Sequence, residues 1–238
     1  KTLKTKHSYK YVNNKDCIEN IQSVVNAYDE PFSDPSQIPT YMLCKFVKKK
    51  ITVAISGEGA DELFGGYPRY KNITSFWNKI KNQPRVFSEL MEAFSESFSS
   101  SKYSYMRSIG KKFRKYSHTN LDSLYNDEMS RWRPDEKILI ERSFRGSYFE
   151  KKLTHLNNIV SDPRYLMMRD IITYLPSNLL VKTDRASMYN SLEIRSPYLD
   201  NDLVSLIWSL PDNFILYKNE KIILKEILKE KLGSSFVN

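Results

Sequence analysis

The sequence has 238 residues, of which 40% are hydrophobic and 27% are charged, and its formal net charge is +9 at pH 7. This composition is ordinary for a globular protein, and the length suffices for one large domain or two small ones. No apolar run approaches the roughly 18 residues that a membrane span requires, and no signal-peptide pattern opens the chain. We therefore expect a cytoplasmic protein with no membrane partner.

The positive charge is spread along the chain, for example over residues 48–50, 111–115 and 218–231. No aromatic and basic recognition motif accompanies these lysines, so nucleic acid is not an expected partner. Cys17 and Cys44 have no CxxC spacing and no histidine cluster nearby, which argues against a zinc site or a disulfide framework. We expect both cysteines to be small core residues of helices.

The N-terminal part alternates between strand and helix patterns. The predicted elements are a strand over 7–12, a helix over 14–28, a loop over 29–39, a helix over 41–49 and a strand over 51–55. Asn13, Asn14 or Asp16 can cap the first helix. The strand over 51–55 lacks alternation, as does a strand buried on both faces of a parallel sheet. This order predicts a parallel α/β sheet with its ligand at the carboxyl ends of the strands.

After about residue 69 strand patterns nearly vanish. The serine-rich segment 95–101 predicts a loop or a mobile connection. Helices are predicted over 135–144, 164–175, 202–210 and 220–232. We therefore expect an α/β nucleotide-binding region over residues 1–70 and a mainly helical remainder over residues 71–238.

The most informative stretch is 51–70, ITVAISGEGADELFGGYPRY, which joins the strand over 51–55 to a glycine-spaced acidic turn and a helix. Gly57 and Gly59 permit positive φ and close approach of a ligand to the backbone. Outward-pointing N–H groups of such a turn suit an anion or a nucleotide. Glu58, Asp61 and Glu62 lie close together and suggest a metal or an amine as partner. On the residues alone, acidic residues that merely complement a helix N-terminus remain an alternative.

Three motifs resemble one family. SGEGADELFGGYPRY closely resembles the second signature of the synthetase domain of glutamine-dependent asparagine synthetases. LPSNLLVKTDRASMYNSLEIRSPYLD, over 175–200, is similar to a second segment of that family, and YDEPFSDPSQIPTY, over 28–41, to a loop of it. The resemblance implies a parallel Rossmann-like sheet of the adenine nucleotide alpha hydrolase type, here incomplete, followed by a mainly helical portion.

The resemblance also implies a reaction. ATP adenylates aspartate and releases pyrophosphate, and ammonia from glutamine then attacks the acyl-adenylate to give asparagine and AMP. The implied cofactors are ATP and Mg²⁺. Ser56 and Gly57 are candidates for contact with the AMP portion, Asp61 for a magnesium ligand, and Glu58 for the base that takes a proton from the attacking amine. Tyr67 and Arg69 are weaker candidates that we expect to support the loop.

The segment 179–188 carries Lys182, Asp184 and Arg185 beside apolar residues. Such charges fit a salt-bridge network, whereas the resemblance implies that this helix lines the acceptor pocket, with Asp184 as a second candidate catalytic residue. The segment SLEIRSPYLD contains three charged residues that we expect to form a domain-packing network, namely Glu193, Arg195 and Asp200.

Several features of the family do not occur in this sequence. The Ser-Gly-Gly-x-Asp-Ser pyrophosphate loop, the basic Arg-x-Lys segment beyond 220–232 and the N-terminal glutaminase domain are all missing. We therefore expect a central fragment that does not catalyse the full reaction alone, with the glutaminase domain as a partner in the same polypeptide. A sugar or unusual carboxylate as acceptor, a non-catalytic relative, a nucleic-acid-modifying ATP pyrophosphatase, and a homodimer as the assembly all stay open.

Overall fold

The computed structural model describes residues 3, 5–99, 101–130, 160–216 and 220–234, and every structural statement below concerns those residues. They form two compact units. The first comprises Lys1–Gly66 with Asp170–Asn238, and the second comprises Tyr67–Arg169. The helix predicted over 135–144 lies outside the described residues. The predicted domain boundary at residue 70 remains a prediction. The two compact units are divided differently, because residues 170–238 belong to the same unit as the N-terminal segment.

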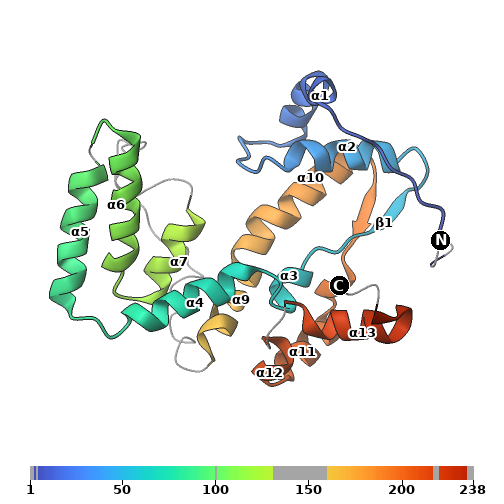
Figure 1. Ribbon diagram of the computed structural model, residues 1–238. Coiled ribbons are helices and arrows are strands. Elements are labelled where there is room, and N and C mark those ends of the chain that lie inside the picture. Colours follow the sequence, from blue (N-terminus) through green and yellow to red (C-terminus); the bar gives the residue numbers. More distant parts are fainter. Residues whose placement is uncertain (1–2, 4, 100, 131–159, 217–219, 235–238) are drawn as a thin grey trace. The chain divides into compact units, whose positions relative to one another are not determined.

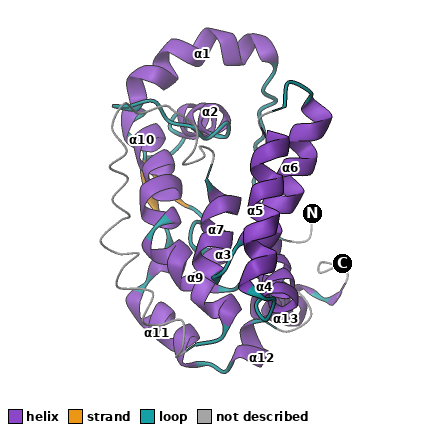
Figure 2. Cartoon of the chain, turned by 90° about the vertical axis from the view of Figure 1, so that its left-hand side faces the viewer, coloured by secondary structure: helices purple, strands orange, loops and turns teal. Residues whose placement is uncertain are grey.

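Helices make up most of both units (Figure 2). The first unit contains α1 (Asn14–Ala27), α2 (Gln37–Val47), β1 (Val53–Ile55), α3 (Ala60–Leu63), the π-helix η2 (Leu175–Leu180), α10 (Val181–Tyr189), β2 (Glu193–Arg195), the 3-10 helix η3 (Pro197–Leu199), α11 (Asn201–Ser209), α12 (Asp212–Ile215) and α13 (Ile222–Leu232). The second contains α4 (Pro68–Ile80), α5 (Arg85–Ser99), α6 (Ser104–Ser117), α7 (Leu121–Met129) and most of α9 (Asp162–Ile172).

Strands β1 and β2 lie side by side (Figure 1) and pair in parallel. Ala54 is opposite Ile194 in this pair. The predicted parallel sheet is thereby confirmed, as a strand pair within the described residues. The predicted burial on both faces is wrong there, because Val53 and Ile55 are 41% and 77% exposed. Successive side chains of a strand point to opposite faces. Ala54 and Ile194 pack against the helical core, so their neighbours in β1 point away from it.

Helices α1, α2 and α10 enclose the core that supports this strand pair. Its buried members are Val24, Ala27, Tyr28, Tyr41, Met42, Cys44, Ala186 and Leu192. Cys44 is therefore a core residue as predicted, and burial raises the pKa of its thiol to about 11. Cys17 is only partly buried. The hydroxyl of Tyr28 donates to the Lys182 carbonyl at 2.9 Å, which ties the end of α1 to α10.

Three predicted boundaries can be compared with the structure at the N-terminus. Helix α1 begins at Asn14, and Asn13 caps it in a capping box with Asp16, as predicted. Helix α2 begins at Gln37, four residues before the predicted start, because Pro39 falls in the first turn, where its missing N–H costs little. The strand predicted over 7–12 is not formed, and Tyr9 and Tyr11 are exposed.

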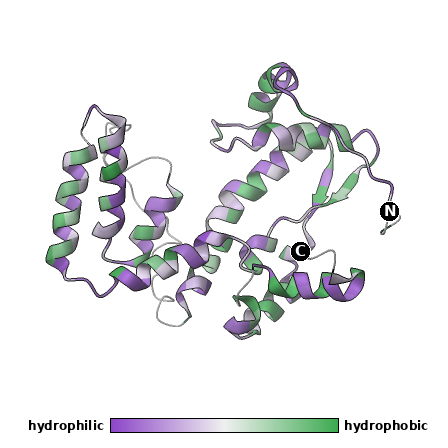
Figure 3. Ribbon diagram, viewed as in Figure 1, coloured by the Kyte–Doolittle hydropathy of each residue, from purple (hydrophilic) through white to green (hydrophobic). Residues whose placement is uncertain are grey.

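In the second unit, α5 and α6 pack side by side (Figure 1). Each mixes hydrophobic and hydrophilic residues (Figure 3), and Phe94 and Phe98 of α5 contact the Phe113 ring of α6. Ser95 and Ser99 belong to α5, so the loop predicted over 95–101 is wrong for most of its length. These small residues face Gly110, where a Cβ would meet the Ser99 hydroxyl at 2.8 Å. The serines therefore allow close helix packing.

The C-terminal helices agree with their predicted ranges. The segment predicted over 202–210 forms α11, and that over 220–232 forms α13. Part of the helix predicted over 164–175 is α9, after which the chain continues through η2 into α10. No helix of the described residues is both long and apolar enough to cross a membrane.

Candidate active site

The turn after β1 has a positive φ at one of the two glycines that were predicted to permit it. Gly59 adopts φ +88°, and a Cβ there would collide with Leu199 Cδ2, so glycine alone fits without rearrangement. Gly57 does not adopt positive φ, and a Cβ at Gly57 would meet nothing within 4 Å. The backbone at Gly57 therefore borders open space, as a ligand contact requires.

Ser56 lies where β1 and β2 end together. Its N–H donates to the Arg195 carbonyl at 2.9 Å, and its hydroxyl lies 3.1 Å from the Ser196 hydroxyl. The Ser56 hydroxyl also accepts a long hydrogen bond of 3.4 Å from the Glu58 N–H. Sequence reasoning missed Ser196. Its signal is positional, because it follows β2 as Ser56 follows β1, and ligands of parallel sheets bind at such carboxyl ends.

Glu58 reaches across to α10. Its Oε1 accepts a hydrogen bond of 2.9 Å from the Thr183 hydroxyl. Glu58 is half-buried and Thr183 is only 6% exposed. Thr183 was not among the residues predicted from the sequence, although it lies between Lys182 and Asp184. The structure thus joins the acidic turn to the second motif through one side-chain contact.

Asp61 lies in the first turn of α3 and forms an ion pair of 2.8 Å with Lys221, the residue that precedes α13. Gly66 lies next to this ion pair, and a Cβ at Gly66 would collide with the Asp61 carboxylate and with Lys221 Cε. The described residues contain no group of three or more histidine, cysteine, aspartate or glutamate side chains able to hold a metal. Magnesium usually takes one or two carboxylates and completes its shell with water and phosphate oxygens. A magnesium ion held by Asp61 would therefore take the rest of its ligands from water and phosphate oxygens. In the structure the Asp61 carboxylate is paired with Lys221.

Helix α10 is tied to the loop over 29–36 by two ion pairs. Lys182 Nζ lies 3.1 Å from Asp34 Oδ2 and 2.9 Å from the Ser36 hydroxyl, and Arg185 lies 2.6 Å from Asp29. These contacts bear out the salt-bridge interpretation for Lys182 and Arg185. The Asp184 side chain is exposed, and within the described ranges no ion pair or hydrogen bond of its carboxylate occurs. The structure does not bring Asp184 into that network.

The Asp34 carboxylate has a lowered pKa. Burial acts in the opposite direction and would raise it, but hydrogen bonds from the Ser36 hydroxyl and N–H, together with the Lys182 ammonium, lower it. The carboxylate is therefore an ionised partner of the nearly buried Lys182.

Two further sets of candidates have structural contacts. Arg195 pairs with Glu193 at 2.7 Å, with both side chains exposed, while Asp200 caps α11 by accepting from the Asp202 and Leu203 N–H groups. Among the described residues, Glu193, Arg195 and Asp200 therefore do not form the single packing network that was predicted.

Arg69 and Tyr67 belong to the second unit. The Arg69 guanidinium lies 3.7 Å from the Tyr67 ring centroid, and its Nε donates to the Tyr125 hydroxyl at 3.1 Å. These contacts stabilise the start of α4.

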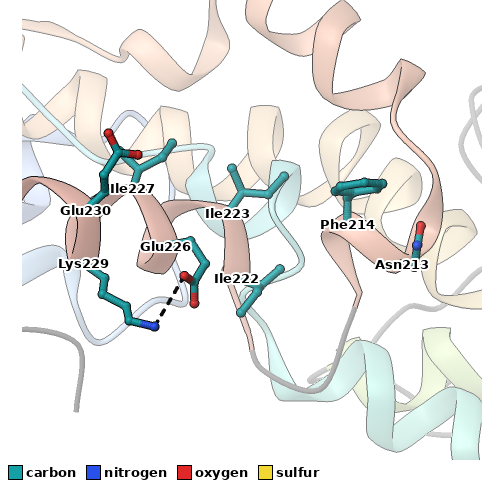
Figure 4. Close-up of a pocket in the computed structure, with 8 residues that line it drawn as sticks. All are labelled: Asn213, Phe214, Ile222, Ile223, Glu226, Ile227, Lys229 and Glu230. Carbon is teal, nitrogen blue, oxygen red and sulfur yellow. Dashed lines mark ion pairs between the residues drawn. The ribbon is translucent and has the colours of Figure 1, made fainter. Parts of the chain in front are cut away.

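An open groove of about 720 Å³ lies along α12 and α13 (Figure 4). Its lining residues are Asn213, Phe214, Ile222, Ile223, Glu226, Ile227, Lys229 and Glu230. The Lys229 and Glu226 side chains approach each other at 3.6 Å on its rim. None of the site residues predicted from the sequence lines this groove, so its size alone does not identify a substrate site.

In open α/β sheets, ligands bind at the carboxyl ends of the strands. The glycine-spaced acidic turn lies at that end of β1 and β2. The sequence profile of the family described as asparagine synthase matches residues 1–238, and the chain belongs to that family. It is 31% identical over 207 residues to asparagine synthetase [glutamine-hydrolyzing] 1 of Bacillus subtilis (strain 168). The matched region covers 85% of this chain and 32% of that relative.

A second relative, asparagine synthetase [glutamine-hydrolyzing] 3 of the same organism, is 26% identical over 228 residues, covering 94% of this chain and 31% of the relative. The chain thus spans about a third of the length of these curated relatives. No solved structure matches it significantly.

Proposed function

We propose that the polypeptide containing this chain is a ligase that uses ATP to adenylate aspartate and then transfers ammonia, derived from glutamine, to give asparagine. The observation that carries this proposal is the placement of Glu58 beside Ser56 and Gly57, at the joint carboxyl ends of β1 and β2. Both relatives reported above are named glutamine-hydrolyzing, which supports glutamine as the ammonia source. A further domain of the polypeptide would supply that ammonia.

In the first step, an oxygen of the aspartate side-chain carboxylate attacks the α-phosphorus of ATP. The bond from that phosphorus to the bridging oxygen breaks, and pyrophosphate leaves. Ser56 and Gly57 would contact the AMP portion, because the Ser56 hydroxyl lies at the strand ends and the Gly57 backbone borders open space. When magnesium is bound with ATP, it offsets negative charge on the phosphates. Asp61 is the residue that would contribute a ligand to it.

In the second step, the ammonia nitrogen attacks the acyl carbon, and the carbon–oxygen bond to AMP breaks. The nitrogen must lose a proton, and a base within hydrogen-bond reach can take it. Glu58 is the proposed base. Asp184 is proposed to act at the acceptor, because its exposed carboxylate on α10 is not engaged by the cations that pair elsewhere on this helix.

The first test measures conversion of ATP to pyrophosphate by the full-length gene product, with aspartate present and absent, beside the isolated 238-residue chain. We expect aspartate-dependent pyrophosphate and asparagine from the full-length protein and no turnover from the chain alone. Turnover with a sugar or another carboxylate in place of aspartate would contradict the proposed substrate. If the folded full-length protein forms neither pyrophosphate nor asparagine in the presence of aspartate, the proposed reaction is contradicted.

A further inference from the structure

The side-chain partner of Glu58 is of a different kind from the partners of four other carboxylates in the first unit. Asp29, Asp34, Asp61 and Glu193 each form an ion pair with lysine or arginine. Glu58 instead accepts one hydrogen bond from the neutral hydroxyl of Thr183. We propose that Thr183 is a positioning residue that holds the Glu58 carboxylate for proton transfer, an inference that rests on the function proposed above.

The contact leaves part of the carboxylate available. Thr183 engages Oε1, and among the described residues no side chain or backbone group donates to Glu58 Oε2. An ionised carboxylate has about four acceptor positions on its two oxygens. A base must be fixed in orientation and must still present an oxygen to the proton that it takes. One neutral donor on one oxygen meets both requirements, whereas a cation would compete with the proton for the same charge.

Thr183, which donates this hydrogen bond, lies on a helix that is anchored by several contacts. Lys182 and Arg185 tie α10 to the loop over 29–36, and the Tyr28 hydroxyl binds the Lys182 carbonyl. Ala186 is fully buried on the same helix. Thr183 therefore projects from an anchored helix, so its hydroxyl can impose an orientation on Glu58 and does not merely follow it.

The geometry of Thr183 is specific to this contact. A threonine hydroxyl inside a helix commonly donates to the carbonyl one turn earlier. Here the preceding turn is the π-helix η2, and the Thr183 hydroxyl donates to Glu58. π-Helical turns occur frequently at functional sites. On the Glu58 side, Gly59 adopts φ +88°, and a Cβ there would collide with Leu199, so the turn that carries the carboxylate requires glycine at this position.

The test uses the full-length protein with Thr183→Val, which keeps the branched shape and removes the hydroxyl, and Thr183→Ser, which keeps the hydroxyl. Single-turnover rates of asparagine formation and of aspartate-dependent pyrophosphate release are measured. We expect T183V to slow asparagine formation about 10-fold, because misplacement of a catalytic group costs up to about 100-fold. Pyrophosphate release should fall less, and T183S should stay close to wild type. Thr183→Ala repeats the test should the valine variant fail to fold.

A double-mutant cycle separates positioning from a general structural role. In a Glu58→Gln background, T183V should cause no further loss, since the residue acts through Glu58. An equal loss in both backgrounds, or wild-type rates for T183V beside an impaired E58Q, would overturn the inference for Thr183 alone. Wild-type asparagine formation by E58Q would overturn the proposed role of Glu58 and this inference with it.

Discussion

Replacing Glu58 by glutamine in the full-length protein is expected to slow asparagine formation by at least about 100-fold, the usual contribution of a general base. Glutamine keeps the shape of the side chain, and its amide oxygen can still accept from the Thr183 hydroxyl. It cannot take a proton from the attacking amine. The fold should therefore persist while amide formation fails, as measured by initial rates with ammonia as the nitrogen donor.

Glu193→Gln is the matched control for this change. Glu193 is a glutamate of β2, the strand that pairs with β1, but its side chain is 53% exposed and pairs with Arg195 at the surface. Exposed ion pairs contribute about 0–1 kcal/mol, so this variant should retain its rates. Near wild-type asparagine formation by E58Q, with E193Q behaving alike, would mean that Glu58 is not the base.

The second large effect concerns stability. Lys182→Met removes the cation from the Asp34 carboxylate, and the two side chains are only 11% and 15% exposed. Removing one partner of a buried pair costs about 3–5 kcal/mol, and we expect the lower end because Ser36 still donates to Asp34. The melting temperature of the full-length protein should fall clearly. Lys229→Met is the control, since its pair with Glu226 lies at the surface and should cost less than about 1 kcal/mol.

The pH dependence of this contribution has a definite sign. Because the folded-state pKa of Asp34 is lowered from 3.8, the ionised carboxylate stabilises the fold fully above that value. The stabilisation is lost as pH falls through the lowered pKa. The difference in melting temperature between wild type and Asp34→Asn should therefore be largest at neutral pH and shrink below pH 3.8. Equal melting of K182M and wild type at neutral pH would show that the pair does not anchor α10.

Much of the local structure could be predicted from the sequence, because its causes are local. Asn13 and Asp16 form a capping box three residues apart, and Gly59 permits the left-handed conformation of the residue that precedes α3. Strand β2, the partner of β1, was not predicted from the sequence, because it is only three residues long and lies far from β1 in the chain. The strand predicted over 7–12 failed because β-type composition forms a strand only when a neighbouring strand pairs with it.

The side-chain partners within the site could not be predicted, because they join residues distant in the chain. Thr183 and Glu58 are 125 residues apart, and Lys182 and Asp34 are 148 apart. Asp61 was predicted as a magnesium ligand from the acidic turn and the family resemblance, neither of which indicates the ion pair with Lys221. Sequence spacing and resemblance thus singled out candidate carboxylates, while the partner of each depended on how the helices pack.

The most direct test of the adenylation claim follows an oxygen atom. Aspartate labelled with ¹⁸O in its side-chain carboxylate is given to the full-length protein with ATP and ammonia, and the released AMP is analysed by mass spectrometry. The proposed attack on the α-phosphorus places one labelled oxygen on that phosphorus, and it leaves with AMP when the amine attacks. We predict one ¹⁸O per AMP formed together with asparagine. Asparagine formed alongside unlabelled AMP would contradict the acyl-adenylate.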